Sequence, residues 1–63
     1  MRLALKIKRL RAQKGWTQQA LAERAQVSLG YVVRLESGHY DPKLSTLRKL
    51  AKALGVPVTA LLE

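Results

Sequence analysis

Apolar residues recur along this 63-residue chain at spacings of three and four, the period of amphipathic α-helices. One such pattern occupies residues 2–14 and ends at Gly15, and another occupies 44–54 and ends at Gly55. A short last pattern is opened by Pro57, which suits the first turn of a helix. The spacing therefore predicts an all-α fold.

Within the two longer patterns the apolar side chains share one face. In the first pattern Leu3, Ile7 and Leu10 lie on that face, whereas Leu5 lies off it. In the second pattern the inward stripe consists of Leu44, Leu47, Leu50, Ala51 and Leu54. We expect both stripes to pack onto the rest of the domain.

Two shorter helical patterns fill residues 17–37, and a hydroxyl residue opens each of them. Thr17 caps the first helix and Ser28 caps the second, because their side-chain oxygens can accept a free backbone N–H of the first turn. Only Gln26 and Val27 separate the end of one helix from the cap of the next. A link this short forces a steep crossing, so a helix-turn-helix is predicted here.

The second of these helices, from about residue 29 to 37, has two different faces. Val32 and Leu35 point inward, and the opposite face carries Gly30, Val33 and Arg34. That outer face is unusually apolar and holds one cation, so it requires a partner surface. For Tyr31, on the flank, contact with a neighbouring helix and direct contact with a ligand are equally favoured.

The chain is strongly basic, with twelve Lys and Arg against four Asp and Glu and a net charge of +8. A polyanion is the expected partner, with nucleic acid ahead of acidic lipid or an acidic protein. The chain has no cysteine and one histidine, so neither a disulfide nor a metal site is expected. No apolar run is long enough to span a membrane and the first residues are too basic for a secretory signal, which favours a soluble cytoplasmic protein.

The sequence shows no set of residues that could carry out catalysis. There is no nucleophile with a matching base, no phosphate-binding glycine loop and no metal-ligand spacing. Sixty-three residues also suit one small domain, near the lower size at which a single core is self-sufficient. We therefore expect a binding domain spanning 1–63, not an enzyme, with no cofactor and no small-molecule ligand.

Three segments of the chain resemble the lambda-repressor/Cro type of helix-turn-helix domain, also called the xenobiotic-response-element family. The segments are IKRLRAQKGWTQQALAERA, VSLGYVVRLESG and DPKLSTLRKLAKALGVPVTALL, and together they cover nearly the whole chain. The resemblance implies a compact five-helix domain whose helix from Leu29 lies in the DNA major groove. The chain departs from the family pattern in having Gln26 where the turn usually has glycine, and Ala20 where an acid often completes a capping box.

The resemblance and the outer face of the second helix together assign roles to individual residues. The predicted base contacts are Ser28, Leu29, Gly30 and Arg34. The predicted phosphate contacts are Gln18, Tyr31, Tyr40 and Lys43. By the resemblance, Arg11 and Glu36 form a structural ion pair that ties the first helix to the end of the third.

A dimer surface is predicted at the end of the chain. Either Leu61 or Leu62 closes the core, and the remaining leucine faces outward with Val56 and Val58; we assigned Leu61 to that surface. The predicted function is sequence-specific binding of double-stranded DNA by a nucleoid-associated transcriptional repressor, as a homodimer on a palindromic operator.

Two rival functions remain open from the sequence. The first is a protein-binding module of the same fold, an antitoxin or a coactivator-like adaptor, that uses the apolar outer face of Leu29, Tyr31 and Val33. The second is a lipid-surface peptide built on the basic first helix, which is disfavoured because Leu5 interrupts its short apolar stripe.

Overall fold

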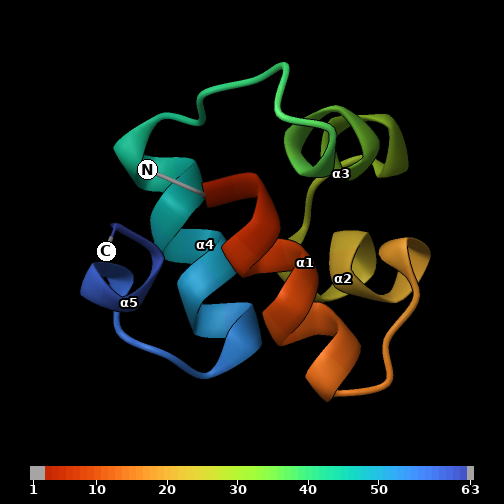
Figure 1. The fold of residues 1–63 in the computed structure, drawn as a ribbon, viewed down its shortest axis with the longest axis horizontal. Helices are drawn as coiled ribbons and strands as arrows, with labels where there is room; N and C mark the ends of the chain where they lie inside the picture. The colour runs from red at the N-terminus through yellow and green to blue at the C-terminus, as the bar shows by residue number, and fades with distance from the viewer. Residues whose placement is uncertain (1–2, 63) are drawn as a thin grey trace.

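Five helices make up residues 3–62, the part of the chain that this computed structural model describes (Figure 1). They are α1 (Leu3–Gln13), α2 (Gln18–Ala25), α3 (Leu29–Glu36), α4 (Leu44–Leu54) and α5 (Val58–Leu62). The predicted all-α, five-helix fold is confirmed, and the observed bounds differ from the predicted ones by one residue at several ends. Arg2, the predicted start of the first helix, lies outside the described residues.

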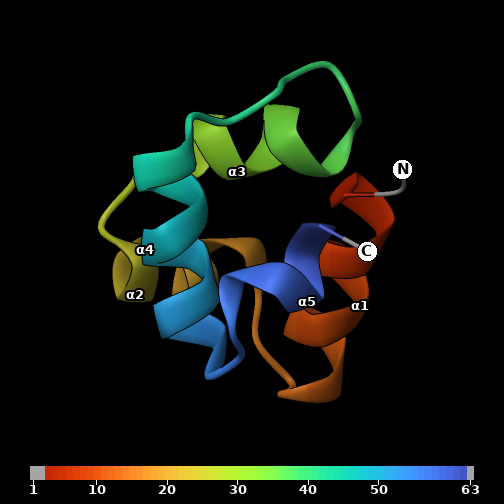
Figure 2. The same ribbon diagram turned by 90° about the vertical axis from the view of Figure 1, so that its left-hand side faces the viewer.

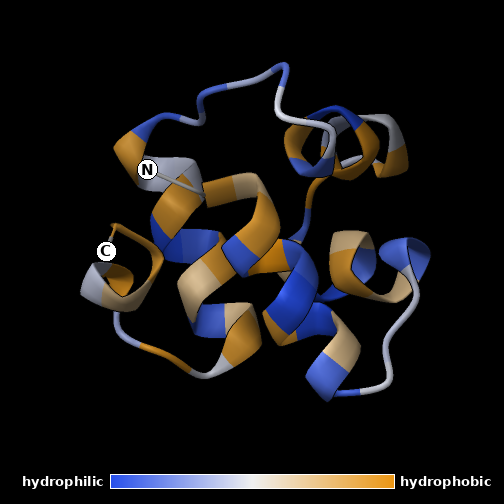
Figure 3. Ribbon diagram, in the orientation of Figure 1, coloured by the Kyte–Doolittle hydropathy of each residue, from blue (hydrophilic) through white to orange (hydrophobic). Residues whose placement is uncertain are grey.

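All five helices contribute to one core. Its buried members are Ile7 of α1, Leu21, Ala22 and Ala25 of α2, Val32 and Leu35 of α3, Leu47, Leu50, Ala51 and Leu54 of α4, and Leu61 of α5. α2 packs against α3 and α4, while α1 packs against α3 and α5. Burial of each large aliphatic side chain stabilises the domain by roughly 1.5–3 kcal/mol, so this core holds α3 in place. The hydropathy colouring in Figure 3 shows the same division into apolar and polar faces along α4.

Two predicted leucine positions are wrong. Leu61, assigned to the dimer surface, is fully buried, and its neighbour Leu62 is 46% exposed instead. α5 is a single short turn, and a shift of one residue in its start rotates every side chain by about 100°, so the sequence did not distinguish the two leucines. Leu44, expected on the inward stripe, is 52% exposed because it is the first residue of α4, where the helix extends past the core.

The helix-turn-helix between Thr17 and Ser37 forms with both predicted caps. The Ala20 N–H donates to Thr17 Oγ1 over 3.0 Å, and the Tyr31 N–H donates to Ser28 Oγ over 3.0 Å. Between the helices Gln26 adopts the left-handed conformation, with φ 59° and ψ 43°. A non-glycine side chain in this conformation costs on the order of 1 kcal/mol, so this turn is strained.

An ion pair joins the first helix to the end of the third. Arg11 Nε lies 2.6 Å from Glu36 Oε2, and Arg11 Nη2 donates to Glu36 Oε1 over 3.0 Å. The remaining nitrogen, Nη1, donates to the Trp16 carbonyl over 2.6 Å, in the link between α1 and α2. These hydrogen bonds to Glu36 raise the pKa of Arg11 above its usual value, against the opposing effect of burial. The structural pair implied by the family resemblance is therefore present.

We expect Gln26→Gly to stabilise the domain by up to about 1 kcal/mol, because glycine adopts the left-handed conformation without the clash of a Cβ atom. Urea unfolding followed by circular dichroism measures the change. The matched control is Gly55→Ala, the reverse exchange at another left-handed position (φ 72°), which should lower the free energy of unfolding. Equal stability of Gln26→Gly and the wild type would show that the turn carries no strain.

Arg11→Ala should lower the free energy of unfolding by roughly 3 kcal/mol or more, because it leaves a buried carboxylate without its cation. The Glu36 side chain is only 2% exposed, so its charge is poorly solvated once the guanidinium is removed. Arg9→Ala, at an exposed position of the same helix, serves as the control and should change stability by less than about 0.5 kcal/mol. If both variants unfold at the same urea concentration, the pair does not hold α1 to α3.

Candidate nucleic-acid interface

The outer face of α3 is open to solvent, as predicted. Leu29 and Val33 are each 43% exposed, whereas Val32 and Leu35 are buried at 0% and 1%. Figure 2 shows α3 lying across one end of the molecule, at the top of the view. The helix therefore offers its whole outer side to a partner.

Gly30 lies on this outer face and has no structural explanation within the protein. A Cβ atom built on it meets nothing within 4 Å, and its backbone does not take the positive φ that favours glycine. Glycine inside a helix costs up to about 1 kcal/mol relative to alanine. At this position no side chain covers the helix backbone, which is therefore accessible from the solvent side.

Arg34 supplies the cation of the outer face. Its side chain is exposed, and within residues 3–62 its guanidinium forms no hydrogen bond or ion pair. Only its backbone carbonyl is engaged, by the Ser37 hydroxyl at 2.8 Å. All five guanidinium N–H donors are thus available to an external acceptor.

Two other predicted contact residues are already hydrogen-bonded inside the domain. Ser28 Oγ accepts the Tyr31 N–H, which leaves the hydroxyl proton of Ser28 available as a donor. Gln18 Nε2 donates to Glu36 Oε1 over 3.1 Å, so the amide of this first residue of α2 is fixed by the ion pair of Arg11. Both side chains are held in one orientation before any ligand binds.

The predicted phosphate contacts after α3 lie in the loop to α4. Tyr40 is 44% exposed, and Lys43 is exposed at the N-cap of α4, where its side chain makes no capping bond. Tyr31 is half-buried, and its ring meets the Tyr40 ring edge-on with centroids 4.7 Å apart. Burial raises the pKa of Tyr31, and its side-chain hydrogen bond with Thr46 acts in the opposite direction. The structure thus brings Tyr31 into contact with neighbouring segments, one of the two alternatives open for it.

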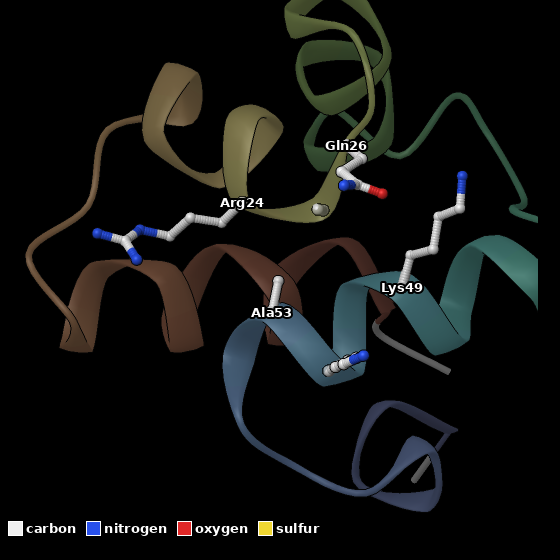
Figure 4. A pocket seen from close by; sticks show the side chains of 6 residues that line it. Arg24, Gln26, Lys49 and Ala53 are labelled. Atoms are coloured by element: carbon white, nitrogen blue, oxygen red, sulfur yellow. The ribbon is translucent and has the colours of Figure 1, made fainter.

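A shallow hollow between α2 and α4, which the sequence did not suggest, lies away from this face. It is lined by Arg24, Ala25, Gln26, Lys49, Lys52 and Ala53 (Figure 4). Figure 4 shows the Arg24 and Lys49 side chains extending away from each other. The Arg24 guanidinium lies 4.4 Å from the Trp16 ring centroid, a cation–π contact. The cations around the hollow are therefore not arranged around a common ligand.

The described part of the chain contains neither a cluster of metal-ligating residues nor a helix that could span a membrane. No group of three or more His, Cys, Asp or Glu residues lies where it could hold a metal ion. The imidazole Nδ1 of His39 lies 3.0 Å from the Ser37 hydroxyl. Among residues 3–62 there is also no helix with the length and apolar character needed to cross a membrane.

Comparisons with known proteins agree with this geometry. The immunity repressor protein of Bacillus phage phi105 is 41% identical over 61 residues, which are 97% of this chain and 42% of the repressor. The HTH-type transcriptional regulator DdrOP3 of Deinococcus deserti is 38% identical over 63 residues, 100% of this chain and 49% of the regulator. The chain thus spans about half the length, or less, of these curated relatives.

Solved structures show the same arrangement of helices. The biofilm master regulator SinR in complex with DNA superposes with a TM-score of 0.92 at 32% identity, covering 97% of this chain and 98% of that chain. The restriction-modification controller protein C.AhdI from Aeromonas hydrophila gives 0.92 at 30% identity, covering 95% of this chain and 91% of that chain. A family model described as Helix-turn-helix (HTH_3) matches residues 7–61. The resemblance noted in the sequence is confirmed, and the chain belongs to the HTH_3 helix-turn-helix family.

Proposed function

We propose that this domain binds double-stranded DNA with α3 in the major groove and regulates transcription as a repressor at the nucleoid. One observation carries the proposal: the outer face of α3 combines exposed Leu29 and Val33, a bare Gly30 and the available guanidinium of Arg34. Nothing within residues 3–62 covers this face. Relatives named as an immunity repressor and a transcriptional regulator support the regulatory role.

Contacts to the bases would come from the start and outer side of α3. Arg34 would donate both prongs of its guanidinium to guanine O6 and N7, a contact worth roughly 1–3 kcal/mol of discrimination. Leu29 would touch a thymine methyl group, and the Ser28 hydroxyl would donate to a base edge or a phosphate. Gly30 would let the backbone of the helix approach the groove closely.

Contacts to the sugar-phosphate backbone would fix the register of the domain on the duplex. Gln18 stands at the N-terminus of α2, where the helix dipole favours an anion, and its amide is oriented by Glu36. The exposed Lys43 and Tyr40 would hold phosphates on the other side of α3. The remaining cations of the chain add long-range attraction that does not depend on sequence.

We propose a homodimer, whose two α3 helices would lie about 34 Å apart, one turn of DNA, on an inverted repeat. The surface we propose for it is Val56, Val58 and the exposed Leu62, with Leu62 in place of the buried Leu61. Both valines are half-buried against the core, so only part of each remains for a partner.

A protein-binding module of the same fold is the second candidate function. The 43% exposure of both Leu29 and Val33 favours it, because an apolar strip also suits a protein partner. Selection of duplexes from a random pool separates the two candidates. A repressor should enrich a defined sequence with two inverted half-sites, whereas an adaptor should retain duplexes of every sequence, with salt-sensitive affinity only. Failure to enrich any sequence would overturn the proposal.

Arg34→Ala and Lys43→Ala should weaken binding in different ways. Loss of Arg34 should flatten the preference at one base position, at a cost of about 1–3 kcal/mol for the preferred duplex. Loss of Lys43 should weaken binding to all sequences alike and reduce the slope of log affinity against log salt by about one. The control is Lys52→Ala, an exposed cation at the hollow between α2 and α4, which should keep both the preference and the slope. An unchanged preferred sequence in Arg34→Ala would contradict the assigned role.

Gly30→Ala should affect stability and DNA binding in different directions. The added methyl group meets nothing in the protein and alanine favours the helix, so the free energy of unfolding should stay equal or rise by up to about 1 kcal/mol. The same methyl group should weaken DNA binding, because it stands between the helix backbone and the groove. Thermal unfolding and a binding titration, run on one preparation, measure both effects. Undiminished affinity would show that the duplex does not approach the helix at this position.

A further inference from the structure

Tyr31, Tyr40 and Thr46 bring together three segments that follow one another in the chain. Tyr31 belongs to α3, Tyr40 to the connecting loop and Thr46 to the first turn of α4. The two tyrosine rings meet edge to face, with an interplanar angle of 80° and centroids 4.7 Å apart. Thr46 also lies close enough to the Tyr31 side chain to lower the pKa of its hydroxyl, against the effect of burial. We call these three residues the tyrosine clasp.

The loop that the clasp holds has little support from its own backbone. Its first part is fixed by the His39 N–H, which donates to the Arg34 carbonyl over 3.2 Å, and its end by the Lys43 carbonyl, which accepts the Leu47 N–H. Between them, residues 40–42 form no backbone hydrogen bond with any part of the described chain. Tyr40 is moreover 44% exposed, so its edge-on contact with Tyr31 is the ordered side-chain interaction at the middle of the loop.

We propose that Tyr31 is a positioning residue, which through Tyr40 and Thr46 fixes the 38–43 loop and the start of α4 relative to the reading helix. Tyr31 would thereby strengthen DNA binding indirectly, through the phosphate contacts of Lys43 and of the Tyr40 hydroxyl. This inference rests on the proposed DNA binding for its functional part, whereas the clasp itself is a property of the unbound protein. It gives Tyr31 a role different from the phosphate contact expected from the sequence.

The physical reason is the cost of ordering a loop at the moment of binding. A side chain on an unfixed loop must lose backbone and rotamer freedom before it can hold a phosphate, and this loss lowers the affinity. With the ring contact made, the loop and Lys43 at the N-cap of α4 keep one placement relative to α3 before the protein meets the duplex. Tyr31 acts here through its ring contact with Tyr40, so its hydroxyl does not need to reach the phosphate.

A double-mutant cycle between Tyr31 and Lys43 tests the proposal on the selected duplex. If Tyr31 acts through Lys43, Tyr31→Ala should weaken binding and also lower the salt slope by up to about one, as Lys43→Ala does. Adding Lys43→Ala to Tyr31→Ala should then have little further effect. A tyrosine that itself bonds a phosphate carries no charge, so its loss should leave the slope unchanged and the two substitutions additive. That second result would overturn the proposal.

Hydrogen exchange in the absence of DNA tests the clasp independently. Tyr31→Ala and Tyr40→Ala should each speed exchange of the His39 and Leu47 amides, whose hydrogen bonds lie at the two ends of the loop, by about 2- to 10-fold, the range set by an aromatic pair. Tyr31→Phe, which keeps the ring contact, should rescue most of the protection, and Thr46→Val should behave like Tyr31→Phe. Leu5→Ala, at an exposed site on α1, is the control and should leave the loop unchanged.

The two measurements separate failure of the clasp from failure of the proposed function. Unchanged exchange in both alanine variants would overturn the clasp, whatever the protein binds. If Tyr31→Ala lowers global stability, the exposed Tyr40→Ala variant carries the exchange test, because it opens the same contact from the loop side. The binding test then compares Tyr40→Ala with Tyr40→Phe, which loses the proposed phosphate contact but keeps the ring, and only Tyr40→Ala should lower the salt slope. If the wild type enriches no duplex, the proposed DNA binding fails, and with it the role of the clasp in binding.

Discussion

The orientation of α3 depends on one buried carboxylate. Glu36, at the last residue of α3, accepts from Arg11 of α1 and from Gln18 of α2, so three helices meet at its two oxygens. Arg11 in turn reaches the Trp16 carbonyl, which fixes the link between the first two helices. Apolar contacts hold the helices together without prescribing an angle between them, whereas hydrogen bonds of this kind require a particular geometry.

Such a network is a matter of specificity more than of stability. Removing two charges from water is costly, and well-packed apolar residues in their place are often as stable or more so. In this domain the charged groups connect the core helices to the candidate interface, because Gln18 both donates a hydrogen bond to Glu36 and is a proposed phosphate contact. The same hydrogen bonds that complete the fold therefore set the direction of a side chain that we propose as a phosphate contact.

The fold followed from the sequence because its signals are local. Helical spacing, the caps Thr17 and Ser28 and the glycine stops identify each helix from a few neighbouring residues. Leu61 and Leu44 were misplaced because their burial is not a local property. The direction of Leu61 depends on the exact start of the short α5, and the exposure of Leu44 depends on how far α4 extends past the core. The periodicity of a short or terminal turn does not contain that information.

Part of the candidate site could be predicted from the sequence for the same reason. The outer face of α3 is a property of one helix, so Gly30 and Arg34 could be identified from their phase alone. The pairing of Tyr31 with Tyr40 and Thr46 joins three segments whose relative placement no local signal encodes. Likewise, the bond from Gln18 to Glu36 spans 18 positions of sequence and appears only when α2 and α3 cross.

The bareness of Gly30 has a consequence for how this domain can change over evolutionary time. A side chain added at Gly30 would meet no other part of the described protein, and Val33 and Arg34 on the same face are exposed. Core packing does not restrict replacements at these positions, so the shape and charge of this surface can change while the fold stays the same. If the proposed DNA contacts hold, a few substitutions on one helix would be enough to give the same scaffold a different target.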